Sequence, residues 1–292
     1  MNKIKSILIV IVALLHASAV SAIDFGGCAT ARQMVKEKRY AEAIAVYEKL
    51  DDSTKDESDN QAYMSQAITI ANDSLKDQEL GFRLAQRVRN AEMRAFYSMP
   101  LYKPEELIAK YKDFDFMKWP EGIRAESYQR RGHAYSALKQ YPEAVRDFET
   151  GVDLPGGEPA EKGIAAKTAG DIYLSQLKDE AKAEKMYRKV LAVTNAGYWF
   201  RNESLLTLAG ILLKNKRNDE ALNLYKDLDI KGNGSPYWKV TLACGYAKAL
   251  AANGQKVKAV EYLNMALQAE TNQANKKLIQ AEIDKLTKDM LE

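Results

Sequence analysis

The residues best suited to chemistry in this sequence are one histidine and two cysteines. Beyond the first 22 positions, His133, Cys28 and Cys244 are the only residues of these two types. A histidine can serve as a general base, and a cysteine can serve as a nucleophile or a metal ligand. Zinc sites bring several such ligands together at short spacing, whereas no two of these residues lie within one helical turn of each other. We therefore expect no metal site.

Neighbouring carboxylates are the second class of chemical candidates. Asp51-Asp52 and Glu105-Glu106 fall at predicted helix ends or in loops, where acidic side chains interact favourably with a helix dipole. Neither a G-x-x-x-x-G-K-[ST] motif nor a G-x-G-x-x-G that opens a helix after a strand occurs, so we expect no cofactor. These observations favour a non-catalytic protein. A hydrolase with His133 as its base stays open as an alternative, and it predicts that His133→Ala abolishes activity.

Aromatic residues form a set that repeats along the chain. Tyr198-Trp199 and Tyr237-Trp238 lie 39 residues apart. In one interpretation these rings pack between repeated elements, each burying about 150–250 Å². In the other they form an exposed aromatic ridge that anchors a partner or stacks on a sugar, and Trp199 and Trp238 are then exposed.

The elements that must position these residues repeat at a fixed interval. Four alanines are 39, 38 and 38 residues apart, and each is followed four residues later by a large ring or a leucine. A constant interval of this size indicates stacked structural repeats, whereas an alanine-rich helical bundle needs no fixed repeat length. The pairs are Ala144 and Phe148, Ala183 and Tyr187, Ala221 and Tyr225, and Ala259 and Leu263.

The clearest unit runs from Tyr128 to Pro155 and resembles the tetratricopeptide repeat. That family has an aromatic residue, then L-G, Y, A, F and P over about 34 residues. Arg131 departs from the expected leucine. The matching positions here are Tyr128, Gly132, Tyr135, Ala144 and Phe148.

The resemblance implies an all-α fold, a right-handed superhelical solenoid of stacked antiparallel helix pairs. Each pair has two helices joined by a tight turn, with small residues where the helices cross. We expect four regular repeats over residues 121–270 and degenerate repeats over residues 23–120, with prolines breaking helices between residues 91 and 120. Residues 271–292 are expected to form a C-terminal capping helix, or alternatively an amphipathic helix that binds a partner.

In this family the first helix of each pair lines an inner groove, so the resemblance implies which side chains face a partner. Some members grip a terminal carboxylate with lysine and asparagine. Lys167 fits one such place, but Asp171 stands where the asparagine is required, so we expect a mixed polar and apolar surface for a protein or peptide. The candidate groove residues are Glu126, Gln129, His133, Ser136, Ile164, Lys167, Asp171, Leu174, Glu203, Leu206, Leu213, Thr241, Cys244 and Lys248.

The N-terminus has the three parts of a secretory signal peptide. Two lysines precede an apolar run over residues 7–15, and small residues follow, which predicts cleavage after Ala22. The run is shorter than the roughly 20 residues that span a membrane. A lipid anchor at Cys28 is not expected, because the residues before it lack the leucine-like lead residue of lipoprotein motifs.

Charge and cysteine usage exclude several kinds of partner and linkage. Without the two lysines of residues 1–22, 43 − 2 = 41 basic residues face 40 acidic ones, and no run of five like charges occurs. This balance argues against binding of nucleic acid or of an anionic membrane surface. The two cysteines fall in the first and last repeats, so we expect no disulfide between them.

Together these features predict an exported, non-catalytic scaffold that binds protein or peptide partners in its groove, in a bacterial periplasm. By analogy with exported members of the family, its role would be to assemble or maintain the cell envelope. The alternative is a glycan- or peptidoglycan-binding helical module that uses the aromatic ridge of Tyr198, Trp199, Tyr237 and Trp238.

Overall fold

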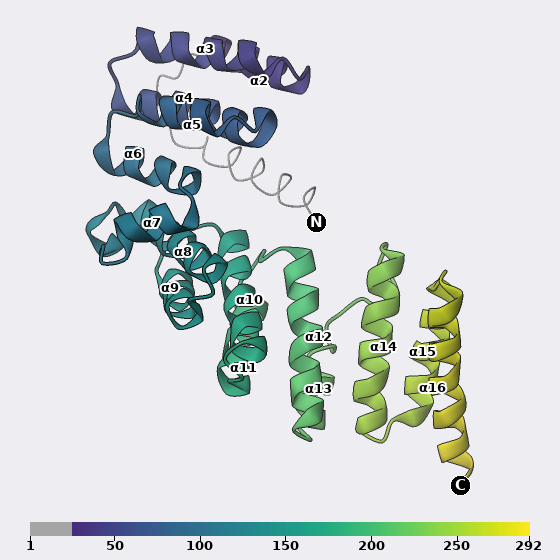
Figure 1. Cartoon of the computed structure of the whole chain (residues 1–292). Helices are drawn as coiled ribbons and strands as arrows, with labels where there is room; N and C mark the ends of the chain where they lie inside the picture. Colours follow the sequence, from purple (N-terminus) through teal and green to yellow (C-terminus); the bar gives the residue numbers. More distant parts are fainter. Residues whose placement is uncertain (1–24) are drawn as a thin grey trace. The chain divides into compact units, whose positions relative to one another are not determined.

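A computed structural model of the chain describes residues 25–292, and every regular element in that range is a helix (Figure 1). The predicted all-α fold of antiparallel helix pairs is confirmed. The predicted signal peptide lies outside the described residues. The chain divides into two compact units, residues 1–158 and 159–292, which we describe separately. The division does not test the repeat boundaries predicted within residues 23–270, which stay predictions.

The described part of the first unit begins and ends with long helix pairs and has shorter elements between them. Helices α2 and α3 form one pair, and α8 and α9 form another. The elements are α2 (Phe25–Lys36), α3 (Tyr40–Ser53), α4 (Glu57–Thr69), the π-helix η2 (Ile70–Leu75), α5 (Gln78–Ala85), α6 (Ala91–Ser98), the 3₁₀-helix η3 (Met99–Leu101), α7 (Pro104–Tyr111), the 3₁₀-helix η4 (Phe116–Lys118), α8 (Glu121–Ala137) and α9 (Tyr141–Asp153).

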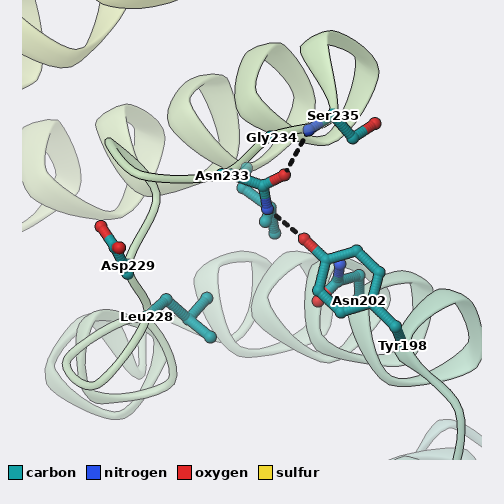
Figure 2. Close-up of a pocket in the computed structure, with 8 residues that line it drawn as sticks. Tyr198, Asn202, Leu228, Asp229, Asn233, Gly234 and Ser235 are labelled. Atoms are coloured by element: carbon teal, nitrogen blue, oxygen red, sulfur yellow. Dashed lines mark hydrogen bonds between the residues drawn. The ribbon is translucent and has the colours of Figure 1, made fainter.

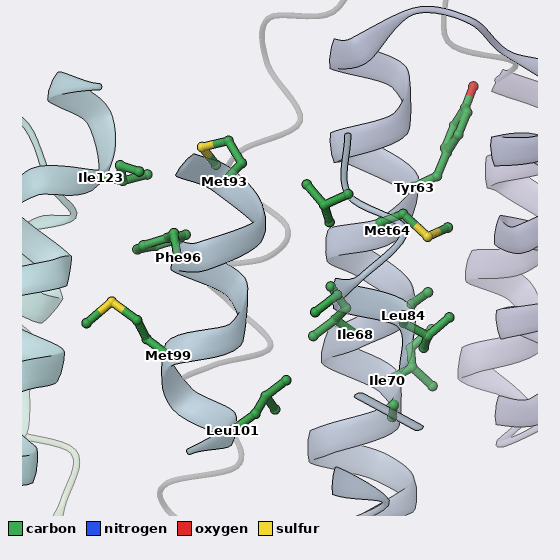
Figure 3. Packing of buried hydrophobic residues seen from close by; sticks show 14 of the residues in the cluster. Tyr63, Met64, Ile68, Ile70, Leu84, Met93, Phe96, Met99, Leu101 and Ile123 are labelled. Carbon is green, nitrogen blue, oxygen red and sulfur yellow. The ribbon is translucent and has the colours of Figure 1, made fainter. Parts of the chain in front are cut away.

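One apolar cluster connects these elements from α2 to α8. Figure 3 shows buried side chains of α4, α5 and α6, with Ile123 of α8 close to the last of these. Met64, Leu84 and Met99 are fully buried within it. Burial of a side chain of this size contributes about 1.5–3 kcal/mol, so the continuous cluster explains why short helices persist in this unit.

The proline-rich stretch between residues 91 and 120 contains only short helices, as predicted. Pro104 occupies the first turn of α7, where the missing N–H costs nothing. After α7, four rings pack within 4.9–6.0 Å of one another at the start of the next helix pair. They belong to Tyr111, Phe114, Phe116 and Trp119.

Arg131, which departs from the family's leucine, anchors this ring cluster to the α8–α9 pair. Its guanidinium forms two hydrogen bonds of 2.7 and 2.8 Å with the Asp147 carboxylate of α9. It also donates, at 2.7 Å, to the carbonyl oxygens of Tyr111 and Phe114. The side chain is buried, so these contacts stand in for hydrogen bonds that the charged group would otherwise make with water.

The second unit is a row of helix pairs that ends in a single helix. Its helices are α10 (Pro159–Ser175), α11 (Glu180–Ala192), α12 (Tyr198–Lys214), α13 (Asn218–Asn223), α14 (Pro236–Ala252), α15 (Lys256–Ala269) and α16 (Gln273–Leu291). Helix α13 is much shorter than expected. Beyond Asn223 the chain continues in tighter turns, and Tyr225 is still buried at its repeat position.

Close helix crossings explain the small residues of the repeat pattern. A Cβ atom added at Gly132 would lie 3.0 Å from the Phe148 ring, and one added at Gly170 would lie 2.8 Å from the Tyr187 ring. Real Cβ contacts are seldom this short, so alanine at either position would force the rings to move. The predicted role of small residues at the crossings is confirmed.

The turns that join paired helices share one backbone conformation. Each contains a residue with φ between 56° and 79°, the left-handed region. In the α8–α9 turn, Lys139 adopts φ 61°, and the next residue, Gln140, donates its N–H to the Tyr135 carbonyl at 2.9 Å, as in a Schellman cap. The equivalent positions are Lys38, Lys76, Lys139, Lys178, Lys216 and Gly254.

Helix α16 packs against α15, as the capping prediction requires. Ile279, Ile283 and Leu286 are buried at helical spacing, whereas Met290 at the end of the helix is 39% exposed. The remaining face carries charged residues, so α16 covers the apolar side of the last pair and presents a polar surface to solvent.

Candidate functional site

In the second unit the first helices of successive pairs lie side by side. Helix α12 contacts both α10 and α14 (Figure 1). Of the predicted groove residues on these helices, Lys248 is exposed and the others are half-buried, so their side chains are accessible in part. We call this surface the first-helix face. It comprises Ile164, Lys167, Asp171, Leu174, Glu203, Leu206, Leu213, Thr241, Cys244 and Lys248.

The four remaining groove candidates lie on α8 of the first unit, and one of them is not accessible. Gln129 is buried against Gly151 of α9, so its assignment to a groove surface is wrong. Glu126 is half-buried and forms a 2.7 Å ion pair with Arg130. Ser136 is half-buried, and His133 is exposed.

His133 lies on the surface of α8 in a ring contact. Its imidazole meets the Phe148 ring edge to face, with the centroids 4.8 Å apart. The ring is therefore held at the crossing of α8 and α9, next to Gly132. This position explains the histidine by packing and gives the hydrolase alternative no geometric support.

Lys167 is engaged by two carboxylates within the first-helix face. Its ammonium lies 2.7 Å from Asp171 on α10 and 3.1 Å from Glu203 on α12. Burial acts to lower the pKa of Lys167, but the hydrogen bonds to Asp171 and Glu203 outweigh it and raise the pKa. Asp171 also accepts the Tyr187 hydroxyl at 2.8 Å. The positive charge of Lys167 is already balanced by two carboxylates, so this lysine is not available to bind a partner's carboxylate.

Cys244 is half-buried on α14, and it does not form a disulfide with Cys28. Burial raises the pKa of the Cys244 thiol, which lowers the fraction of reactive thiolate at neutral pH. The thiol therefore acts as a small apolar surface group. Leu206 on α12 lies over Gly245, the residue next to Cys244.

Of the four predicted ridge residues, one is buried and three are exposed. Trp238 is 4% exposed, so the expectation that both tryptophans are exposed is wrong for this residue. Trp199 is 42% and Tyr237 55% exposed, and their rings stack with centroids 5.6 Å apart and planes 2° apart. Tyr198 is also exposed and meets Trp238 edge to face at 6.1 Å. We call these four residues the aromatic cluster.

A pocket that the sequence reasoning missed adjoins this cluster (Figure 2). It has a volume of about 500 Å³ and lies between α12, the loop after α13 and the start of α14. Asn233 of the loop donates to the Tyr198 hydroxyl and accepts the Ser235 N–H at 3.0 Å, which ties the loop to α12. The pocket is lined by Tyr198, Asn202, Leu228, Asp229, Asn233, Gly234, Ser235 and Leu242.

Asn202 is the unusual residue of this pocket. It is 2% exposed, and its Nδ2 atom has no hydrogen-bond partner among residues 25–292. An unsatisfied buried amide typically costs about 1–3 kcal/mol of stability. Asp229 lies on the loop and is exposed, with its Oδ1 atom accepting the Gly232 N–H at 2.8 Å. The pocket therefore combines a buried donor, a carboxylate and two leucine side chains.

Two kinds of site are absent from the part of the chain that the structure describes. No group of three or more His, Cys, Asp or Glu side chains there could hold a metal ion. Within the same residues, no helix has the length and apolar content that crossing a bilayer requires.

The comparison with protein families identifies the α8–α9 pair. A family model described as "Tetratricopeptide repeat" matches residues 125–156. Residues 125–156 therefore match one tetratricopeptide repeat. The matched unit is the one in which sequence reasoning found the clearest pattern. In the second unit the α10–α11 pair has the same close crossing at Gly170, and Lys178, Lys216 and Gly254 have the same left-handed turn conformation. Stacked repeats of this kind offer extended surfaces that bind other proteins. No curated protein matches the chain in sequence.

Several solved structures that resemble the chain are described as tetratricopeptide-repeat proteins or domains. A repeat protein from Parabacteroides merdae is 15% identical, with 90% of this chain and 97% of that chain covered and a TM-score of 0.40. The TPR2AB domain of yeast Sti1, solved in complex with pHSP90, is 17% identical over 89% and 95%, with a TM-score of 0.34. A Bacteroides fragilis repeat protein is 17% identical over 88% and 95%, with a TM-score of 0.27.

Proposed function

We propose that this protein is a non-catalytic scaffold that binds a protein or peptide partner on the first-helix face of its second unit. The observation that carries the proposal is the side-by-side packing of α10, α12 and α14, whose facing side chains remain partly accessible. A row of aligned helices offers one continuous docking surface across successive repeats.

The composition of the face supports a mixed rather than a purely ionic contact. Three leucines lie among the charged groups, and Lys167 is already paired within the face. Apolar side chains of this kind exclude water from an interface, while exposed rim charges tune the rate and specificity of association. We expect the partner to be an extended segment or a helix with its own apolar side chains.

We also propose that the protein acts after export, in a bacterial periplasm, where a role in assembling or maintaining the cell envelope would suit it. The support is the basic, apolar and small-residue pattern of residues 1–22. Sequencing the N-terminus of the protein purified from its host tests the proposal. Export predicts that the mature chain begins at Ile23, whereas an intact Met1 would contradict it.

Site-specific photocrosslinking in the native host tests the docking surface. A photoreactive amino acid at Lys248, on the first-helix face, is expected to trap one partner reproducibly, and mass spectrometry identifies it. The matched control places the same group at Lys258, an exposed lysine on α15. Equal adducts at both positions, or none at either, would reject the first-helix face as the docking surface.

A substitution then tests whether the trapped partner depends on the apolar part of the face. Leu174→Glu places a charge where the side chain is half-buried, and it should weaken binding of the purified partner by more than about 1 kcal/mol. Circular dichroism should show unchanged helix content. A partner that binds Leu174→Glu as tightly as the unmodified protein does not dock there.

A further inference from the structure

We infer that the pocket between α12, the 228–235 loop and α14 binds one neutral sugar unit of an oligosaccharide. The neighbouring aromatic cluster would contact the adjacent sugar units. This site is separate from the docking surface proposed above. It is formed entirely by residues 198–242 of the second unit.

The first observation is the buried donor. The Asn202 amide is 2% exposed and lines the pocket, yet its Nδ2 atom has no partner within the described residues. Figure 2 shows its side chain beside the Tyr198 ring, on the side of α12 that faces the loop. Buried amides are normally paired, and an oxygen acceptor that enters the pocket would satisfy this one.

The second observation is the charge at the opposite wall. Among residues 25–292, Asp229 is the only charged one that lines the pocket. Its carboxylate repels anionic ligands and accepts hydrogen bonds from donors. A neutral ligand that presents an oxygen to Asn202 and an O–H or N–H to Asp229 therefore suits both groups. A sugar ring carries hydroxyl groups of both capacities on adjacent carbons.

The third observation is the apolar surface beside these polar groups. Leu228, Leu242 and the Tyr198 ring line the pocket, and a sugar presents an apolar C–H face to such surfaces. Ring contacts continue from Tyr198 through Trp238 to the stacked pair of Trp199 and Tyr237. Because this stacked pair is flat and exposed, it offers a second place for a neighbouring sugar ring.

The probes are chitotetraose, cellotetraose and an uncharged, end-capped peptide of serine and leucine, titrated into the purified protein. Trp119 and Trp238 are buried, so among the three tryptophans Trp199 is the one that solvent-borne ligands reach. We expect at least one tetrasaccharide to shift its fluorescence and to give a binding isotherm by calorimetry, and we expect no response to the peptide.

Asn202→Leu is expected to weaken saccharide binding about tenfold or more, because the acceptor loses its donor. In the absence of ligand, the same variant should have a higher melting temperature, since it removes an unsatisfied amide. The matched control is Ser204→Ala. Ser204 is also on α12, fully buried and unpaired at its Oγ atom within the described residues, but it does not line the pocket.

Asp229→Asn provides a variant that does not depend on the helix core. The amide oxygen can still accept the Gly232 N–H, so the loop should keep its conformation while saccharide affinity falls. Asp227→Asn, two residues earlier and exposed, should leave affinity unchanged. The inference is overturned if neither saccharide binds, if only the peptide binds, or if both pocket variants bind saccharide as tightly as the unmodified protein.

Discussion

At the scale of single residues, the buried ion pair of Arg131 and Asp147 gives a structural role to a residue that departs from the family pattern. The guanidinium satisfies a carboxylate on α9 and two backbone carbonyls that precede α8. A leucine at this position would pack against α9 but could satisfy none of these three acceptors. The arginine therefore stabilises the irregular segment before α8 as well as the α8–α9 pair.

Arg131→Met should lower the free energy of unfolding by about 3–5 kcal/mol, because it leaves the Asp147 carboxylate buried without its cation. Urea unfolding followed by circular dichroism measures the loss. Adding Asp147→Leu to the same chain should recover part of it, because the buried charge is then removed as well. A single variant as stable as the unmodified protein would show that this pair does not hold the segment.

The exposed ion pairs of Arg39 provide the comparison for this result. Arg39 contacts Glu37 and Glu42 at 3.0 and 2.6 Å, but all three side chains are exposed. Arg39→Met should change the unfolding curve little, because exposed ion pairs are screened by water and salt.

At the scale of elements, the left-handed turn residues reveal the repeat where amino-acid identities do not. Lys38 and Lys76 are 38 residues apart, the same interval that separates Lys178, Lys216 and Gly254. The N-terminal helices thus share the turn geometry of the matched repeat, although their sequences match poorly. A lysine tolerates this conformation less readily than glycine does, because its Cβ atom approaches the carbonyl oxygen.

Lys139→Gly should raise the free energy of unfolding by up to about 1 kcal/mol, since glycine adopts φ 61° without strain. Gly254→Ala should lower it by a similar amount in the equivalent turn. Chemical denaturation measures both changes. The control is Lys185→Gly within α11, where glycine should cost about 1 kcal/mol. A loss of stability in Lys139→Gly would contradict the turn argument.

The sequence predicted the helix pairs well because their determinants are local and recur. Small residues at crossings, and a ring or leucine four residues after each alanine, specify which faces meet, as the Gly132–Phe148 and Gly170–Tyr187 contacts show. Prolines likewise marked the short helices of residues 91–120. The sequence did not predict that α13 is short. Its alanine and tyrosine keep their repeat positions, but the backbone leaves the helix between them.

The pocket could not be predicted because it depends on how a loop folds back on a helix. Residues 224–235 separate α13 from α14, whereas residues 193–197 suffice between α11 and α12. Gly232, Asn233 and Gly234 are typical of a connection between helices, but they do not determine its conformation. Asn202 was equally hidden, since a polar residue within a helix gives no indication of being buried without a partner.

At the scale of the whole molecule, the chain is built as two compact units joined near residue 158. The connection between α9 and α10 contains Gly156 and Gly157, both exposed and both with φ near 73°. Such a segment is easily bound in extended form by a protease, whereas helical backbone resists cleavage.

Limited digestion with subtilisin should therefore cut first between residues 154 and 158. Mass spectrometry of the early products should give two fragments that meet there, and the C-terminal fragment should retain helical circular dichroism. The reference site is the segment at Lys55 and Asp56 between α3 and α4, where both residues are exposed. Earlier cleavage at that reference site would contradict the assignment.

The matching left-handed joints at Lys178 and Lys216 also make the chain between them a cassette. A copy of residues 179–216 inserted after Lys216 would begin and end at the same backbone conformation as the original. Lengthening the protein by whole cassettes therefore asks for no newly designed linker, and the number of repeats becomes a variable that an engineer, or gene duplication, can change one step at a time.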